Sequence, residues 1–116
     1  MKLKKVVGIL LLVCASPVFA GFVGDAAVGR IHTKSNGYVY FGVVSPPSDT
    51  CRWYGEDFRF DVTTPAGKAM LSNLLAGKAA SKQISVWYQP SSAPGTTESN
   101  GCDESSIAIV TGVSQQ

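Results

Sequence analysis

Five short segments of the chain are predicted to be β-strands: the first, third and fourth alternate apolar and polar positions, which is the pattern of strands that bury one face, and the second is a strongly β-prone run. The segments are residues 28–34, 38–44, 57–62, 82–88 and 105–113. Asn36 and Gly37 separate the first two segments, and both residues accept positive φ, so we expect a hairpin there. Pro46 and Pro47 cannot donate a hydrogen bond to a sheet ladder and end the second strand.

One segment between the third and fourth strands has the helical period instead. Thr64 is a good N-cap, and Pro65 suits the first helical position, where its missing N–H has no partner to lose. The pattern predicts that the helix ends near residue 80 or 81. Gly67 and Gly77 lower the helical propensity, so packing must hold this helix more than propensity does.

The predicted order of elements is therefore β-β-β-α-β-β, and the fold class is mainly β with one helix. This is the plan of the OB-fold, a small five-stranded Greek-key barrel. We expect the helix to plug one open end of the barrel with an apolar stripe of Leu71, Leu74 and Leu75. A β-sandwich and an α+β meander use the same elements and remain as alternatives.

The first 20 residues have the features of a cleaved secretory signal. Three lysines precede an apolar run at residues 6–13 that is too short to span a bilayer, and residues 18–20 read VFA, which predicts cleavage after Ala20. A lipid anchor on Cys14 is the alternative, but Val13 fits that motif poorly. We expect one OB-like domain over residues 21–116, secreted or periplasmic, with no membrane insertion.

Removal of this leader changes the charge of the protein. The whole chain has 10 Lys and Arg against 8 Asp and Glu, but three of the lysines belong to the leader, so the mature chain has a net charge of −1. No cluster of Lys or Arg stands out in the remainder. The sequence therefore argues against a nucleic-acid partner.

Two cysteines remain in the mature chain, Cys51 and Cys102. An even pair in an exported chain predicts one disulfide. Closing a loop of about fifty residues stabilises a fold by roughly 4 kcal/mol in the chain-entropy model, which is a large share of the stability of a small domain. Two thiols and one distant histidine make a poor zinc site, so we expect no metal and no cofactor.

The arrangement of these elements resembles the B subunits of bacterial toxins in the subtilase-cytotoxin and pertussis-like group. The residues that carry the resemblance are the helix and following strand GKAMLSNLLAGKAASKQISVWY, the hairpin strand YVYFGVV and the ending SSIAIVTGV. The resemblance implies a non-catalytic subunit that binds cell-surface glycans, assembles as a homopentamer and acts with a separate toxin A subunit. The shorter chain and its single cysteine pair depart from that group, and no sugar-contact residue carries over.

Aromatic residues are the best candidates for ligand contacts, because sugars stack their C–H faces on such rings and Tyr and Trp keep a polar atom for hydroxyls. Trp53 and Tyr54 lie on a loop beside a cysteine. Trp87 lies on the strand face opposite Ile84 and Val86, so it faces outward if those two face the core. These three are the predicted ligand-binding residues, although a core or interface role explains such rings equally well.

Other polar residues carry weaker signals. His32 is the only histidine and shares a strand face with Arg30 and Lys34, which favours a solvated or lightly bonded side chain. Asp57 and Asp61 flank a strand, but nothing else in the pattern supports paired-carboxylate hydrolysis. The chain has no Gly-rich phosphate loop, HExxH or GxSxG pattern, and we expect no enzymatic activity.

Two functions of different classes follow from these observations. The first is a secreted, non-catalytic glycan-binding domain, with ring assembly as the resemblance implies. The second is a periplasmic or secreted protein-binding module, such as an inhibitor of a host enzyme. For the second function, the long polar loop at residues 89–101, which we expect to be mobile, is the candidate inserting element.

Overall fold

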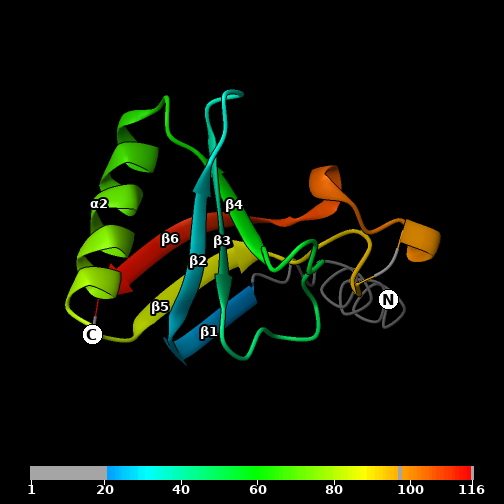
Figure 1. Ribbon diagram of the computed structural model, residues 1–116, viewed down its shortest axis with the longest axis horizontal. Helices are drawn as coiled ribbons and strands as arrows, with labels where there is room; N and C mark the ends of the chain where they lie inside the picture. The colour runs from blue at the N-terminus through cyan, green and yellow to red at the C-terminus, as the bar shows by residue number, and fades with distance from the viewer. Residues whose placement is uncertain (1–20, 97, 116) are drawn as a thin grey trace, which may run out of the picture.

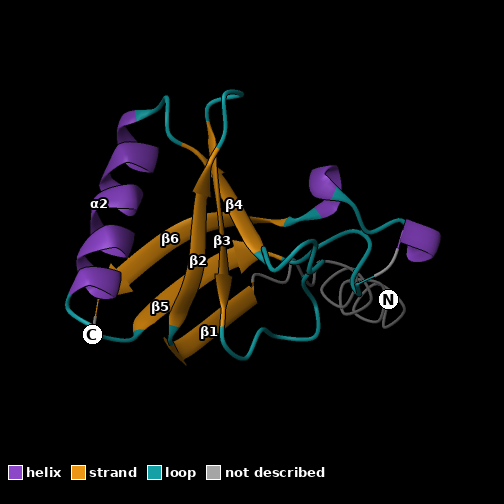
Figure 2. Cartoon of the chain, viewed as in Figure 1, coloured by secondary structure: helices purple, strands orange, loops and turns teal. Residues whose placement is uncertain are grey.

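The computed structural model describes residues 21–96 and 98–115, and the predicted signal peptide with its Cys14 lies outside the described residues. These residues form six strands and one α-helix, together with two short 3-10 helices (Figures 1 and 2). The elements in chain order are β1 (Gly21–Ala26), β2 (Val28–Thr33), β3 (Tyr38–Val43), β4 (Phe58–Asp61), α2 (Pro65–Ala79), β5 (Ile84–Gln89), η1 (Glu98–Asn100), η2 (Glu104–Ser106) and β6 (Ala108–Gln115).

All six strands belong to one mixed sheet in the order β1-β5-β6-β4-β3-β2. Neighbouring strands are antiparallel except for β4 and β6, which are parallel. Strands β1 and β2 stand at opposite ends of this order, yet only Ala27 separates them in the chain. The N-terminal segment therefore bends from one edge of the sheet to the other.

The predicted fold class, mainly β with one helix, is confirmed, and the helix lies between the third and fourth predicted strands as expected. The expectation of five strands is corrected, because β1 is an additional strand that precedes the first predicted one. The sheet is also not closed into a barrel by a ladder between its outermost strands. The physical reason for both differences is the bend at Ala27. It divides the N-terminal segment into β1, which pairs with β5, and β2, which pairs with β3.

The main core lies on one face of the sheet, where alternate residues of each strand converge. The fully buried members include Phe41 of β3, Phe58 of β4, Val86 of β5 and Leu74 of α2. Phe41 and Phe58 are directly opposite in the sheet, and their ring centroids lie 5.2 Å apart. The buried face predicted for the third strand, which carries Phe58 and Phe60, is thus confirmed.

Helix α2 stands at one end of the sheet and packs against β6, with a smaller contact to β2 (Figure 1). The backbone N–H of Gly67 donates to the Thr64 side chain at 3.0 Å, which confirms the predicted N-cap, and Pro65 occupies the first turn. The predicted apolar stripe is narrower than expected. Leu74 is fully buried and Leu71 is partly buried, whereas Leu75 is 47% exposed.

The two glycines of the helix explain the narrow stripe, because they mark the positions where the helix backbone comes closest to its neighbours. A Cβ on Gly67 would lie 1.7 Å from the Asp61 carbonyl oxygen, and a Cβ on Gly77 would lie 2.7 Å from a methyl group of Ile84. These close approaches bring Leu74 down onto the core and turn Leu75 to water. The glycines therefore hold the helix in place, although they lower its intrinsic propensity.

The predicted disulfide between Cys51 and Cys102 is confirmed, with 5.5 Å between the two Cα atoms. Both cysteines are fully buried in a second, smaller cluster with Tyr40 and Ile107, separate from the main core. The disulfide ties the loop between β3 and β4 to the segment that leads into β6. It therefore closes the chain over the face of the sheet opposite the main core.

The long loop after β5, expected to be mobile, is tied to the loop that carries Cys51. The Ser91 N–H donates to the Asp49 carbonyl at 2.9 Å, and the Gly95 N–H donates to the Thr50 carbonyl at 3.1 Å. The Arg52 N–H in turn donates to the Gly95 carbonyl at 2.8 Å. The two loops thus form a short bonded layer around the disulfide.

The close approach at Gly67 generates a prediction about stability. Gly→Ala at an exposed helical position stabilises by about 1 kcal/mol through propensity, but Gly67→Ala should destabilise by about 1–3 kcal/mol because the new methyl overlaps a backbone oxygen. Urea unfolding of the mature protein measures the change. The control is Ala76→Gly at an exposed position of the same helix, which should cost about 1 kcal/mol. A more stable Gly67→Ala variant would contradict the packing described here.

The disulfide generates a second prediction. Replacing both Cys51 and Cys102 by Ala should lower the free energy of unfolding by about 4 kcal/mol, because the unfolded chain regains the entropy of an open loop. Urea unfolding of the double variant, compared with the native protein under oxidising conditions, provides the measurement. Adding reductant to the double variant should change nothing further, and a loss below about 1 kcal/mol would show that the loop layer holds without the bond.

Candidate functional site

The face of the sheet opposite the main core, called here the outer face, carries the residues with binding potential. The strand register places Tyr40 of β3 opposite Arg59 of β4, and Arg59 opposite Ile109 of β6. Ile109 in turn lies opposite Gln89 of β5. One row of side chains therefore crosses four strands on the outer face, and the disulfide cluster covers one end of it.

The other end of the outer face presents two exposed aromatic rings. Trp87 of β5 lies directly opposite Phe22 of β1, and the ring centroids are 5.1 Å apart with the planes tilted by 50°. Trp87 is 41% exposed and Phe22 is 55% exposed. The outward direction predicted for Trp87 is thus observed, and Ile84 and Val86 lie in the main core.

Both rings pack closely beside glycines of the sheet. A Cβ on Gly112 of β6 would meet the Trp87 indole at 3.3 Å, and a Cβ on Gly24 of β1 would meet the Phe22 ring at 3.3 Å. A side chain at either glycine would push the ring outward. The pair therefore forms an open apolar platform, defined by Phe22, Trp87, Gly24 and Gly112 and called here the aromatic platform.

Trp53 and Tyr54, the other two predicted ligand residues, lie on a tight turn in the loop before β4. Trp53 and Glu56 exchange two backbone hydrogen bonds of 2.9 and 3.0 Å, and the two residues between them, Tyr54 and Gly55, both have positive φ. Tyr54 is 77% exposed, whereas Trp53 is partly buried against the disulfide cluster. Among the described residues no ring contact joins this turn to the aromatic platform, so the predicted set divides into two places.

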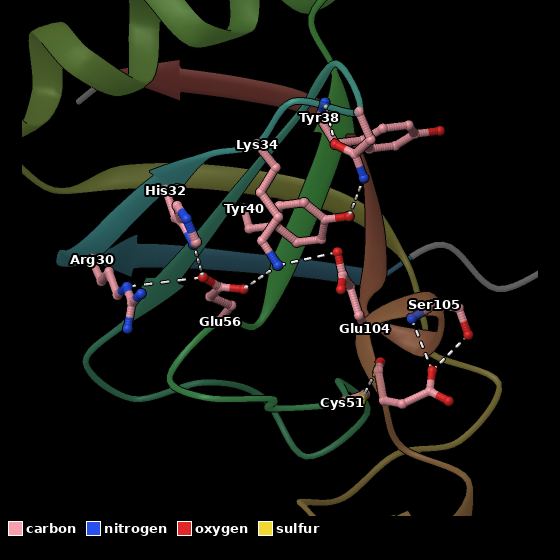
Figure 3. Close-up of polar contacts among 11 residues, drawn as sticks. Arg30, His32, Lys34, Tyr38, Tyr40, Cys51, Glu56, Glu104 and Ser105 are labelled. Carbon is pink, nitrogen blue, oxygen red and sulfur yellow. Dashed lines mark hydrogen bonds and ion pairs between the residues drawn. The ribbon is translucent and has the colours of Figure 1, made fainter.

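The tight turn ends in a buried acidic residue that the sequence reasoning did not single out. Glu56 is 2% exposed, and its carboxylate lies 2.8 Å from His32 Nδ1, 3.9 Å from Arg30 Nε and 3.8 Å from Lys34 Nζ (Figure 3). The expected common side of Arg30 and His32 of β2 and of Lys34, which directly follows β2, is therefore observed. Their shared partner is a carboxylate from a distant loop, which strand alternation cannot reveal.

Lys34 also connects this cluster to the segment after Cys102. Its Nζ lies 3.1 Å from Glu104 Oε1 and 4.2 Å from the centre of the Tyr40 ring (Figure 3). Hydrogen bonds from Lys34 and Tyr40 hold the pKa of Glu104 below its ordinary value. The Tyr40 hydroxyl also accepts a hydrogen bond from the Asn36 side chain at 3.1 Å, so the turn between β2 and β3 is part of the same network.

The two aspartates considered for hydrolysis have structural partners. Asp57 is fully buried, accepts a hydrogen bond from the Val43 N–H at 3.0 Å and pairs with Arg52 at 3.0 Å; burial raises its pKa above the ordinary value. Asp61 accepts hydrogen bonds from the Thr63 N–H and hydroxyl, which lower its pKa. Both carboxylates therefore fix loops against strands.

The site and fold together define a small, disulfide-bonded, mainly β domain with an aromatic platform on its outer face. Comparison of the chain with known protein families, curated proteins and solved structures finds no match. Within residues 21–96 and 98–115, no helix is long and apolar enough to cross a membrane. No group of three or more His, Cys, Asp or Glu side chains in the same residues is arranged to hold a metal ion.

Sequence reasoning missed three parts of the outer face: Phe22, Glu56 and Arg59. Phe22 belongs to the strand that directly follows the predicted cleavage site, where glycines interrupt the alternation. An alternation search that tolerates glycine would have found it. Glu56 and Arg59 gain their surroundings only through long-range contacts, and no local signal marks either of them.

The buried position of Glu56 generates a prediction. Glu56→Gln keeps the shape but removes the charge that three basic side chains share, so it should cost about 1.5–3 kcal/mol of unfolding free energy. Glu104→Gln removes a carboxylate that is half exposed and should cost less than about 1 kcal/mol. Urea unfolding at pH 7 compares the two variants. Equal losses would show that burial of Glu56 does not strengthen its contacts.

Proposed function

We propose that this chain is a secreted, non-catalytic carbohydrate-binding protein that holds glycans against the aromatic platform. The observation that carries the proposal is the pair of exposed, mutually tilted rings, Phe22 and Trp87, packed beside Gly24 and Gly112. Sugar rings present C–H faces that stack on aromatic rings, and the exposure of both rings leaves them accessible to such a ligand. The disulfide supports export, because such bonds persist in oxidising compartments.

The platform is costly for a protein that has no partner for it. Two large apolar side chains lie side by side at the edge of the sheet, where β1 is the outermost strand. Burial of apolar surface contributes about 25 cal/mol per Å², so these rings would stabilise the protein more if the fold covered them. Contiguous exposed apolar surface of this kind marks binding sites.

The resemblance to toxin B subunits extends the proposal to ring assembly with a separate A subunit. Strands β1 and β2 are the outermost strands of the sheet, and an outermost strand offers backbone groups to a further strand. In this proposal, copies of the chain meet along these edges and the platforms line one surface of the assembly. Light scattering of the mature protein measures the assembly state, and a monomer at all concentrations would remove this part of the proposal.

A protein-binding module is the second candidate function, and the tight turn favours it. Tyr54 is a non-glycine residue with φ of +51° and is 77% exposed, so both its backbone conformation and its exposure are unfavourable for the isolated chain. Large aromatic side chains dominate the energetics of protein interfaces. A pull-down from host secretions that succeeds with the native protein and fails with Tyr54→Ala would support this function.

The platform generates a prediction about glycan binding. Trp87→Ala should weaken binding to the glycans selected on an array by at least about fivefold, because a stacked ring contributes on the order of 1 kcal/mol or more. Trp87→Phe should restore most of the affinity, since a ring again covers Gly112. Calorimetry with the best array glycan provides the measurement.

Tyr54→Ala is the matched control, because it removes an aromatic ring of greater exposure from a different part of the surface. It should leave glycan affinity unchanged. Urea unfolding establishes that each variant remains folded. A native protein that binds no glycan on the array refutes the proposed function, and equal affinity of Trp87→Ala and the native protein places the glycan away from the platform.

A further inference from the structure

A cavity of about 190 Å³ opens on the outer face beyond the aromatic platform, where β4, β5 and β6 meet. Its walls are Arg59 of β4, Gln89 of β5, residues 90–92 after β5, and residues 105–109 leading into β6. Gln89 follows Trp87 by two residues on β5, so the cavity lies about 7 Å along the strand from the platform. It belongs to the same face but has different chemistry.

Arg59 is the charged group of this cavity, and the fold neutralises it only in part. Its Nε donates to the Ile107 carbonyl and its Nη2 donates to the Ser105 carbonyl, both at 2.8 Å. These bonds hold one edge of the guanidinium, and its centre lies 5.6 Å from the centre of the Tyr38 ring. The guanidinium therefore has a fixed orientation, so little side-chain entropy remains to be lost when it binds an anion.

The remaining N–H groups of Arg59 have no protein acceptor within the described part of the chain, and no carboxylate lies within ion-pair distance of it there. The charge of Arg59 is one of the smaller causes that lower the pKa of Glu104, but the Glu104 carboxylate itself pairs with Lys34 at 3.1 Å. A partly buried cation is thus fixed by neutral carbonyls, and within residues 21–96 and 98–115 no carboxylate forms an ion pair with it. Such a cation is prepared for an anionic ligand.

We infer that this cavity binds the carboxylate group of a ligand through Arg59. A carboxylate matches the planar fork of a guanidinium, and the amide of Gln89 and the hydroxyl of Ser92 supply neutral donors beside it. A single cation among neutral walls suits a group with one negative charge. The partly exposed Ile109 provides an apolar wall for the carbon atoms next to the carboxylate.

The size of the cavity limits what enters it. Pockets that enclose a drug-sized ligand measure about 300–1,000 Å³, so this cavity holds a small acid or one group of a larger molecule. The same chemistry serves a free carboxylic acid and the carboxylate of an acidic sugar. The inference does not depend on glycan binding at the platform, since Arg59 and Trp87 are separate groups on separate strands.

Titration of the ¹⁵N-labelled mature protein with sodium acetate, sodium glucuronate and glucose at constant ionic strength and pH 7 tests the inference by NMR. We expect saturable shifts at the amides of Ser92 and residues 105–109 with both carboxylates and none with glucose. Arg59→Gln should weaken carboxylate binding at least tenfold. Gln89→Glu should weaken carboxylate binding by the same factor, because it places a negative charge in the cavity. This variant keeps the contacts of Arg59 to Ser105 and Ile107, so it tests the site even if Arg59→Gln loosens residues 105–107.

Arg30→Gln is the matched control, because it removes another partly exposed arginine from the same outer region of the protein; it should change carboxylate affinity less than twofold. Equal affinity for acetate and glucuronate assigns the cavity to free carboxylic acids, and at least tenfold tighter binding of glucuronate assigns it to acidic sugars. Absence of saturation, binding of glucose at the same amides, or retention of affinity in both cavity variants overturns the inference. If the protein binds array glycans through Trp87 but binds neither carboxylate, the proposed function stands and the inference about the cavity is overturned.

Discussion

The Cys51–Cys102 disulfide determines which part of the outer face is covered and which part is open. It holds the loop before β4 against the segment before β6, and its buried cluster with Tyr40 and Ile107 covers one end of the face. The aromatic platform remains open at the other end. The Arg59 cavity forms at the boundary, because its walls include the segment that follows Cys102. Covalent closure of one loop layer therefore sets the boundary between the covered and the open parts of this face.

Two buried carboxylates help to fix the loop that carries Cys51, in addition to its disulfide and apolar cluster. Glu56 and Asp57 are consecutive buried carboxylates that bind different partners: Glu56 meets the basic face of β2, and Asp57 binds the Val43 N–H and Arg52. Loss of either partner would leave a buried charge uncompensated, which is costly. Glu56 also ends the exposed tight turn with Tyr54, so its contacts to the basic side chains anchor that turn. The loop tip therefore has a defined conformation although it has few apolar contacts.

Glycines serve one physical purpose in three parts of the molecule, which is to let another group come close. Gly67 admits a backbone oxygen to the helix, and Gly24 and Gly112 let aromatic rings approach the sheet closely. Propensity scales count each of these residues as a cost to its helix or strand. That cost is local, whereas the gain lies in contacts with residues far away in the chain. The same residues therefore look weak in the sequence and prove necessary in the fold.

The sequence by itself determined the elements that depend on local rules. Apolar alternation and β-prone runs predicted five strands, capping chemistry predicted the start of the helix at Pro65, and an even pair of cysteines predicted the disulfide. Tertiary structure alone decided the bend at Ala27, the placement of Glu56 against β2 and the approach of residues 105–109 to Arg59. Each of these joins residues through contacts between segments, and an interaction of that kind leaves no periodic trace in the sequence.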